Sequence, residues 1–441
     1  MAGGNQLGEG RLTLIALNCI HIAVCCLSLV CVATAYPEFH ISYHPSGLFD
    51  AVITILAVAA ISLLFALARF SFGYFVGFYF YTMILGYLWI NRFSELSYNH
   101  ALAALSAATS AIVFLLPSLF VSSPIRRIFV LTPKAFDRIL ASILLLATIT
   151  IIDGARYNFT FVSIEDIYTF RDQLAFPTAL NYLIGITSNA LLPFAFACFV
   201  CRRNFWWAGA ALLLMSLFYP ITLSKLALFT PVWLVAMTLI SKIFDIKIAV
   251  TLSILAPVSA GIVLFVLFTN GAISYNASIP FFGLINFRMV AIPSLAMEFY
   301  NYFFSEHELT YFCQMRLLKT LTSCPYQEPL AVVINHAFGV GGNFNASLFA
   351  TEGVASVGPL FAPFTAFAGG LVIAFGNRLS AGLPSRLILI SGGVICQAFL
   401  NVPFTTAMLS HGTGLLFLLW YLTPRALFTE NDQKTPMAMS R

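Results

Sequence analysis

Three observations predict that this chain is an all-α, polytopic integral membrane protein. Of its 441 residues, 60% are hydrophobic and only 9% are charged, whereas soluble domains carry about 25% charged residues. Apolar runs of about 20 residues recur along the whole length, and each can cross a bilayer as a helix. The 22 Lys and Arg residues are spread through short connections, as orientation signals are. We therefore expect one membrane domain over 1–441 and no nucleic-acid partner.

Twelve apolar segments are expected to form the spans. The first, 12–35, is interpreted as an uncleaved helix, because it exceeds the 7–15 apolar residues of a signal-peptide core. The others follow at 48–68, 72–91, 101–121, 139–152, 178–200, 205–221, 226–241, 248–269, 352–375, 387–403 and 407–423. The fifth is short, and the seventh and eighth are nearly continuous, so eleven or thirteen spans are alternatives.

The Lys and Arg bias predicts that both termini, including a short tail at 424–441, are cytoplasmic. Most basic residues then lie on the cytoplasmic side. The outer ones are Arg92, Arg156, Arg171, Lys225, Arg288, Arg316 and Lys319.

Two outer connections are longer than turns, at 153–177 and 270–351. The second is too long for a structureless loop in a compact protein. Its apolar spacing predicts amphipathic helices at the outer membrane surface. It also contains Cys313 and Cys324, which can form a disulfide if that side is oxidising.

Three outer cations could converge on one anion, although solvated or snorkelling side chains are the simpler interpretation. Arg171 lies in the first long connection, Lys225 in a tight outer turn, and Arg288 in the second long connection. A diphosphate would be stabilised there by bidentate arginine contacts.

The stretch MEFYNYFFSEHE, residues 297–308, combines aromatic rings with carboxylates around His307. A metal site is disfavoured, because alternate residues share no helix face; we expect neither metal nor cofactor. A general base, His307 or a glutamate such as Glu298, is an alternative to a solvated helix end. Rings that stack on sugars and acids that accept hydroxyl hydrogen bonds favour a glycan ligand.

Other patterns restrict the function. The chain has neither a P-loop nor a dinucleotide fingerprint, so no nucleotide-driven pump is indicated. The predicted spans contain almost no ionisable residues near their centres, where ion-coupled transporters usually place them.

A series of pieces in order resembles the Wzy-type O-antigen or oligosaccharide repeat unit polymerases of bacterial inner membranes. The pieces are FYFYTMILGY with FSELSYNHA, SIEDIYTFRDQ, LSKLALFTP, NFRMVAIPSLAMEFYNYFFSEHE and NFNASLFATEGVASVGPLFAPFTAFAGG, which together span about 72–375. The resemblance implies a GT-C-like, metal-independent glycosyltransferase that acts at the periplasmic face. It would polymerise polyprenyl-diphosphate-linked oligosaccharide units by transferring the growing glycan to the non-reducing end of a new unit, in O-antigen, capsule or exopolysaccharide synthesis.

The resemblance also implies roles for residues and partners. Arg171 and Arg288 would stabilise the diphosphate leaving group, with help from Lys225, and His307 or Glu298 would activate the acceptor hydroxyl. Further substrate contacts would come from Tyr168, Tyr300, Asn345 and Arg316. The partners would be membrane lipids and the flippase and chain-length regulator of the same pathway. The connection holding Arg171 is short for this family, and Glu352 does not align with a family acid.

Two other functions stay open. An O-antigen ligase would use the same donor and outer-face chemistry with a different acceptor. A transporter or flippase of lipid-linked or small hydrophilic substrates would also fit twelve spans, but it predicts internal repeats and polar groups at the midplane.

Overall fold

The computed structural model shows an all-α, multi-pass membrane protein. It describes residues 2–163, 167, 170, 174–315, 323–339, 344 and 349–428. Eleven helices in these ranges are long and apolar enough to cross a membrane. The chain divides into two compact units. Unit 1 comprises 1–121, 247–374 and 399–405, and unit 2 comprises 122–246, 375–398 and 406–441.

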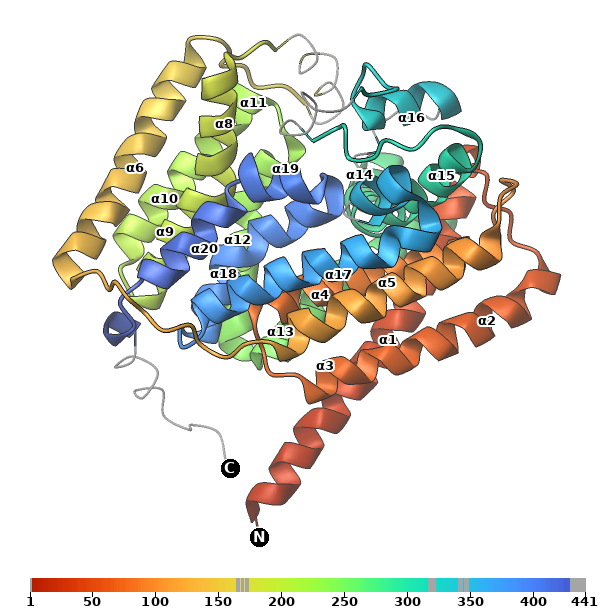
Figure 1. The fold of residues 1–441 in the computed structure, drawn as a ribbon, viewed down its shortest axis with the longest axis horizontal. Coiled ribbons are helices and arrows are strands. Elements are labelled where there is room, and N and C mark those ends of the chain that lie inside the picture. The colour runs from red at the N-terminus through yellow and green to blue at the C-terminus, as the bar shows by residue number, and fades with distance from the viewer. Residues whose placement is uncertain are drawn as a thin grey trace. The chain divides into compact units, whose positions relative to one another are not determined.

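Unit 1 holds the first helices of the chain and those that follow residue 246 (Figure 1). They are α1 (Ala2–Ala35), η1 (Pro37–Phe39), α2 (Pro45–Ala59), η2 (Ala60–Ser62), α3 (Leu63–Leu67), α4 (Phe72–Ile90), α5 (His100–Phe120), α13 (Ile246–Thr269), α14 (Tyr275–Phe282), η4 (Gly283–Ala291), α15 (Ile292–Glu306), α16 (Leu330–Phe338), η5 (Phe349–Val354) and most of α17 (Ala355–Ser380).

Unit 2 holds the middle of the chain and its C-terminal helices. They are α6 (Pro133–Ala155), α8 (Thr178–Ile186), η3 (Thr187–Leu191), α9 (Leu192–Cys201), α10 (Phe205–Leu217), α11 (Tyr219–Thr222), α12 (Lys225–Ile243), most of α18 (Ser385–Asn401), most of α19 (Phe404–Leu409) and α20 (Thr413–Leu422).

The predicted spans agree with these helices, with two differences. The first ten predicted segments coincide with helices long enough to cross a membrane, and the last two fall on shorter apolar helices, 385–401 and 413–422. A further long apolar segment, Tyr275–Glu306, lies inside the connection predicted at 270–351. Its path is described below.

Helix α4 is the core of unit 1. Every residue from Phe72 to Ile90 is buried, as expected for a helix that is apolar all round. The Ser71 hydroxyl caps its start by accepting from the backbone N–H of Tyr74 at 3.1 Å, which satisfies one free donor of the first turn. The loop after α4 starts α5 in the same way, through the Asn99 side chain.

Helices α1 and α13 run parallel, as two contacts along their lengths show. The Thr251 hydroxyl, near the start of α13, donates to Asn18 Oδ1, at the middle of α1, at 3.1 Å. Further along, the amide of Asn286 donates to Ser28 Oγ and to the Val258 carbonyl, both at 2.9 Å. The C-terminal ends of α1 and α13 therefore lie at the same end of unit 1.

Helix α4 ends at that end too, because the connection after α1 pairs with the connection after α4. The backbone N–H of Ser42 donates to the Phe93 carbonyl at 2.9 Å, and Ile41 and Ser94 form an antiparallel bridge. In Figure 1 this end carries α14, α15 and α16, opposite the N-terminus.

The segment Tyr275–Glu306 enters unit 1 beside α13. The Phe282 ring stacks on Phe265, near the C-terminal end of α13, at 4.5 Å between centroids. Asn286 reaches Val258, which lies about 16 Å from that end at 1.5 Å per residue. The chain therefore descends between α1 and α13 as far as η4.

The same segment then returns along α4. The Ser294 hydroxyl donates to the Met83 carbonyl inside α4 at 3.0 Å, and Glu298 contacts Tyr98 in the loop beyond α4. The segment thus starts and finishes at one end of unit 1. It is one unbroken helix with the length and composition of a span, but because both of its halves contact the same end of unit 1 we call it the re-entrant segment.

In unit 2 the connection 153–177 packs on α11. The Tyr219 hydroxyl donates to the Val162 carbonyl at 2.6 Å, and the Asn158 amide donates to the Pro220 carbonyl at 2.8 Å. Ile167 is fully buried against Tyr219 and Leu223. The described part of this connection therefore packs against α11.

Candidate functional site

Arg288 lies on η4, the π-helical part of the re-entrant segment. Such segments occur frequently at functional sites. Its side chain is half-buried and makes neither a hydrogen bond nor an ion pair with any acid in the described ranges. A half-buried guanidinium without a carboxylate partner is costly in a membrane domain, where such charges usually mark a functional site. Arg288 is thus available to an anionic ligand.

Glu298, on α15, is completely buried. Its Oε2 accepts a hydrogen bond from the Tyr98 hydroxyl at 2.6 Å. The Ser94 side chain also lies beside this carboxylate, while its Oε1 has no close hydrogen-bond partner among the described residues. Because a substrate hydroxyl cannot reach a carboxylate enclosed in this way, the geometry favours a positioning role for Glu298 over general-base catalysis.

Tyr98 belongs to a polar network between α4, α5 and α15. Its hydroxyl lies 2.9 Å from the Asn91 amide and 3.2 Å from the Tyr87 hydroxyl. Burial, followed by the nearby Tyr87 and Glu298 groups, raises the pKa of Tyr98 well above its usual value. The phenol therefore stays protonated and donates to Glu298.

His100, at the start of α5, completes the network. Its Nε2 donates to the Leu96 carbonyl at 2.8 Å, because a carbonyl can only accept. Its Nδ1 is then an acceptor for the Asn91 amide at 3.1 Å. The ring thus links the loop 91–99 to the start of α5. This loop carries Tyr98, which contacts Glu298 on α15.

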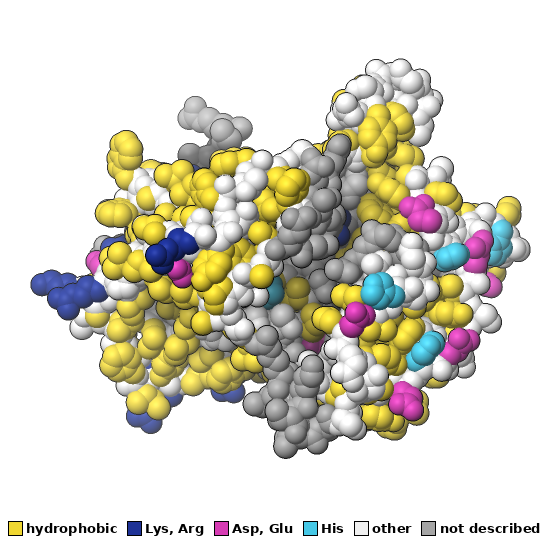
Figure 2. Space-filling view, turned by 90° about the horizontal axis from the view of Figure 1, so that it is seen from above, with side chains coloured by type: hydrophobic (Ala, Val, Ile, Leu, Met, Phe, Trp, Pro, Cys, Tyr) yellow, Lys and Arg dark blue, Asp and Glu magenta, His cyan; other side chains and the backbone are white. Residues whose placement is uncertain are grey.

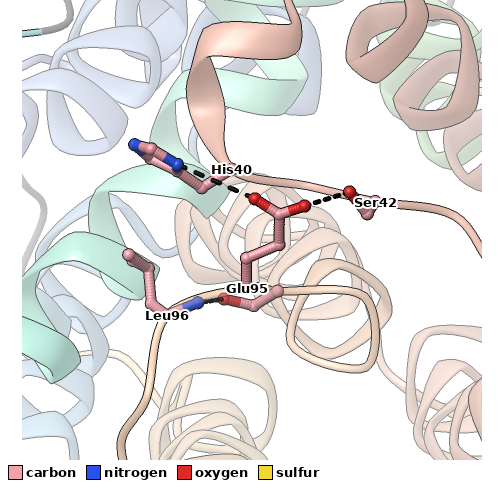
Figure 3. A network of polar contacts seen from close by, with 5 residues as sticks. His40, Ser42, Glu95 and Leu96 are labelled. Atoms are coloured by element: carbon pink, nitrogen blue, oxygen red, sulfur yellow. Dashed lines mark hydrogen bonds and ion pairs between the residues drawn. The ribbon is translucent and has the colours of Figure 1, made fainter.

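The loop 91–99 is itself held by the segment after α1 (Figure 3). The Glu95 carboxylate accepts from the Ser42 hydroxyl and lies 3.8 Å from His40 Nδ1. The backbone N–H of Glu95 donates to the His40 carbonyl at 3.0 Å. These contacts keep Tyr98 in place over Glu298.

His307 follows α15 and is exposed. Its ring stacks on Phe303, with 3.9 Å between centroids and 5° between planes. Its Nδ1 donates to the Phe303 carbonyl at 2.8 Å. In the neutral ring this leaves Nε2 as an acceptor, so His307 presents a fixed, exposed imidazole.

Arg288 and His307 lie at opposite ends of α15. The 15 residues of this helix separate its ends by about 21 Å at 1.5 Å per residue. That distance exceeds the combined reach of the two side chains. A diphosphate bound at Arg288 and an acceptor hydroxyl beside His307 would therefore lie at different positions along α15, and the roles of the two residues in one transfer reaction stay a prediction.

The face around His307 is acidic. In the ranges 36–44, 91–99, 301–315 and 323–339 the only basic residue is Arg92. The carboxylates in the same ranges are Glu38, Glu95, Glu306, Glu308 and Glu328. Figure 2 shows acidic and imidazole side chains gathered on this part of the surface. These five carboxylates suit the hydroxyl groups of a glycan.

Tyr300, on α15, and Glu352, on η5, lie near each other. Tyr300 is buried, and its hydroxyl donates to the Phe344 carbonyl at 3.4 Å beside Thr351 and Glu352. Glu352 Oε1 accepts from the backbone N–H and the hydroxyl of Thr405, at 3.1 and 3.2 Å. Both side chains therefore hold α15 to η5 and to the start of α19.

The other predicted site residues lie outside the described ranges or in unit 2. Arg171, Tyr168, Asn345 and Arg316 lie outside the described residues. Lys225 starts α12 in unit 2. The predicted convergence of Arg171, Lys225 and Arg288 on one anion therefore stays a prediction.

Cys313 and Cys324 form a disulfide. It closes the segment after α15, which is also joined to the start of α17 by the backbone N–H of Thr310 donating to the Ala355 carbonyl at 2.8 Å. The start of this segment is thus bound to α17 at Thr310, and the disulfide joins Cys313 to Cys324 further along.

The network around Glu298 was not predicted; it consists of Tyr87, Asn91, Tyr98 and His100. A weak signal was present, because FSELSYNHA places a tyrosine, an asparagine and a histidine side by side directly after an apolar run. The missing information was the contact itself, which joins residues 200 positions apart.

The buried position of Glu298 predicts different effects for two substitutions. Glu298→Gln retains an acceptor for Tyr98, so we expect normal folding and a transfer rate within about tenfold of wild type. Glu298→Ala leaves a cavity and an unsatisfied phenol and should cost about 2–4 kcal/mol of stability. A general base would instead lose about 100- to 10,000-fold in rate on conversion to glutamine. Thermal unfolding and initial rates of the two variants separate these cases.

No protein-family model, no curated protein and no solved structure matches this chain.

Proposed function

We propose that the protein polymerises lipid-linked oligosaccharides at the outer face of a bacterial inner membrane. The observation that carries the proposal is Arg288, a half-buried guanidinium on a re-entrant segment without a carboxylate partner in the described ranges. Such a cation stabilises negative charge that develops on a diphosphate leaving group. The polyprenyl chain of the substrate would keep that diphosphate close to the membrane.

In the proposed reaction the bond between the anomeric carbon and the diphosphate oxygen breaks. A hydroxyl oxygen of the next lipid-linked unit forms the new glycosidic bond, and its proton is taken up by the released diphosphate. Arg288 binds the departing diphosphate, together with Arg171 if the predicted convergence holds. The acidic and aromatic face around His307 binds sugars further along the glycan.

Two features support the proposed orientation. Disulfides persist in oxidising compartments, so the pair Cys313–Cys324 favours a periplasmic location for the segment after α15. The Lys and Arg bias of the sequence favours the same side. Together they support a donor diphosphate that approaches Arg288 from the periplasm.

A defined assay tests the function. The purified full-length protein in lipid nanodiscs is given a fluorescent polyprenyl-diphosphate-linked oligosaccharide as sole substrate. We expect a ladder of longer lipid-linked products and the release of unsubstituted polyprenyl diphosphate. An unchanged substrate would contradict the polymerase. Products that form only when a lipid-core acceptor is added would identify a ligase.

A lipid-linked oligosaccharide transporter is the second candidate, and one observation favours it. His21 is buried near the middle of α1, where its Nε2 lies 2.9 Å from the Thr82 hydroxyl, and so it is an exception to the apolar span centres. Proteoliposomes would distinguish the two functions, because a transporter moves the labelled substrate across the bilayer without elongating it.

A further inference from the structure

Three consecutive exposed rings mark one end of unit 2, where α10 begins. The exposed fractions are 60% for Phe205, 92% for Trp206 and 53% for Trp207. The Trp207 ring stacks on Phe199 at 6.3 Å, and the Lys242 ammonium lies 5.7 Å from the centre of the Phe205 ring. Rings from α10 and a cation from α12 thus form one cluster.

Two cations of this cluster lack an acidic partner. Arg202 is paired with Asp137 on α6. Arg203 and Lys242, by contrast, are exposed and contact no carboxylate in the described part of the chain. The cluster therefore presents two net positive charges beside Phe205 and Trp206.

Apolar surface leads from the cluster along both helices. On α12 the exposed residues recur at helical spacing, so they share one face; they are Val232, Val235, Leu239 and Ile243. On α10 Leu213 is 63% exposed, two turns beyond Trp206. Because α10 and α12 pack together, this surface suits hydrocarbon chains whose polar head lies at Lys242.

We propose that the cluster binds the phosphate headgroup of an anionic phospholipid. Arg203 and Lys242 contact the phosphate, as basic groups at the ends of spans do. Trp206 lies at headgroup depth, where tryptophan is enriched. The acyl chains follow the exposed apolar residues of α10 and α12. A free phosphate would use the cations but would leave the rings and the apolar surface without a partner.

Native mass spectrometry of the full-length protein tests the proposal, with titrations of phosphatidylglycerol and phosphatidylcholine. We expect the wild type to prefer phosphatidylglycerol. Lys242→Gln and Arg203→Gln should each weaken its binding about fivefold, and the double variant about 25-fold, since a basic residue near an anionic surface contributes about 1 kcal/mol. Trp206→Ala should weaken both lipids, because it removes the ring that lies among the headgroups.

The matched control is Lys134→Gln. Lys134 is an exposed lysine at the start of α6, three residues before the Asp137 that pairs with Arg202, and no aromatic ring of the described residues lies under it. It should leave both affinities unchanged. Equal binding of the two lipids by the wild type, or an equal loss in Lys134→Gln, would overturn the proposal. Displacement of phosphatidylglycerol by inorganic phosphate at matched concentration would overturn the assignment to a lipid.

Discussion

Replacement of Arg288 by alanine is expected to lower the rate of glycan transfer at least about 100-fold, the usual loss when one electrostatic stabiliser of a transition state is removed. The amount of folded protein should not change, because the guanidinium makes no hydrogen bond or ion pair with a described residue. Arg288→Lys should recover part of the rate, since lysine keeps the charge but loses the bidentate geometry. Initial rates with the fluorescent lipid-linked substrate measure both effects.

Arg156→Ala is the matched control for Arg288. Arg156 is another arginine predicted on the outer side, but it is exposed and forms an ion pair with Asp153 at 3.5 Å. Exposed pairs contribute little to stability, so this variant should behave like wild type. Wild-type turnover in Arg288→Ala, or an equal loss in Arg156→Ala, would remove Arg288 from the site.

Replacement of Gly261 by alanine should destabilise unit 1 by about 2–4 kcal/mol, through overpacking and lost hydrogen bonds. A Cβ added at Gly261 would lie 1.7 Å from Oδ1 of Asn286 and 2.8 Å from its Cγ. Asn286 would have to move and would lose its hydrogen bonds to Ser28 and Val258. These bonds hold the re-entrant segment against α1 and α13. Thermal unfolding in detergent, followed by size-exclusion chromatography, measures the loss.

Gly209→Ala provides the control, because Gly209 also lies in a helix but has no atom within 4 Å of the added Cβ. It should be neutral or slightly stabilising, since alanine favours helices more than glycine does. The double variant Gly261→Ala, Asn286→Ala should recover part of the stability by removing the clash. If the double variant is no more stable than Gly261→Ala alone, the contact with Asn286 is not the cause.

Part of the candidate site was predictable from local sequence. The stretch 297–308 was predicted to carry rings and acids at the end of a helix, and the exposed His307 on its Phe303 support lies there. Local sequence could not separate the roles of Glu298 and His307. One acid is enclosed by α4, the loop 91–99 and α15, while the imidazole nine residues later is in solvent.

The sequence by itself determined the class of this protein and the positions of most spans, because hydropathy and charge act over about 20 consecutive residues. Only the tertiary structure decided the path of Tyr275–Glu306. This segment is as long and apolar as a span, yet contacts with α13 at one side and α4 at the other return it to the end of unit 1 where it began. Those contacts join residues far apart in the chain, and the pattern within the segment does not encode them.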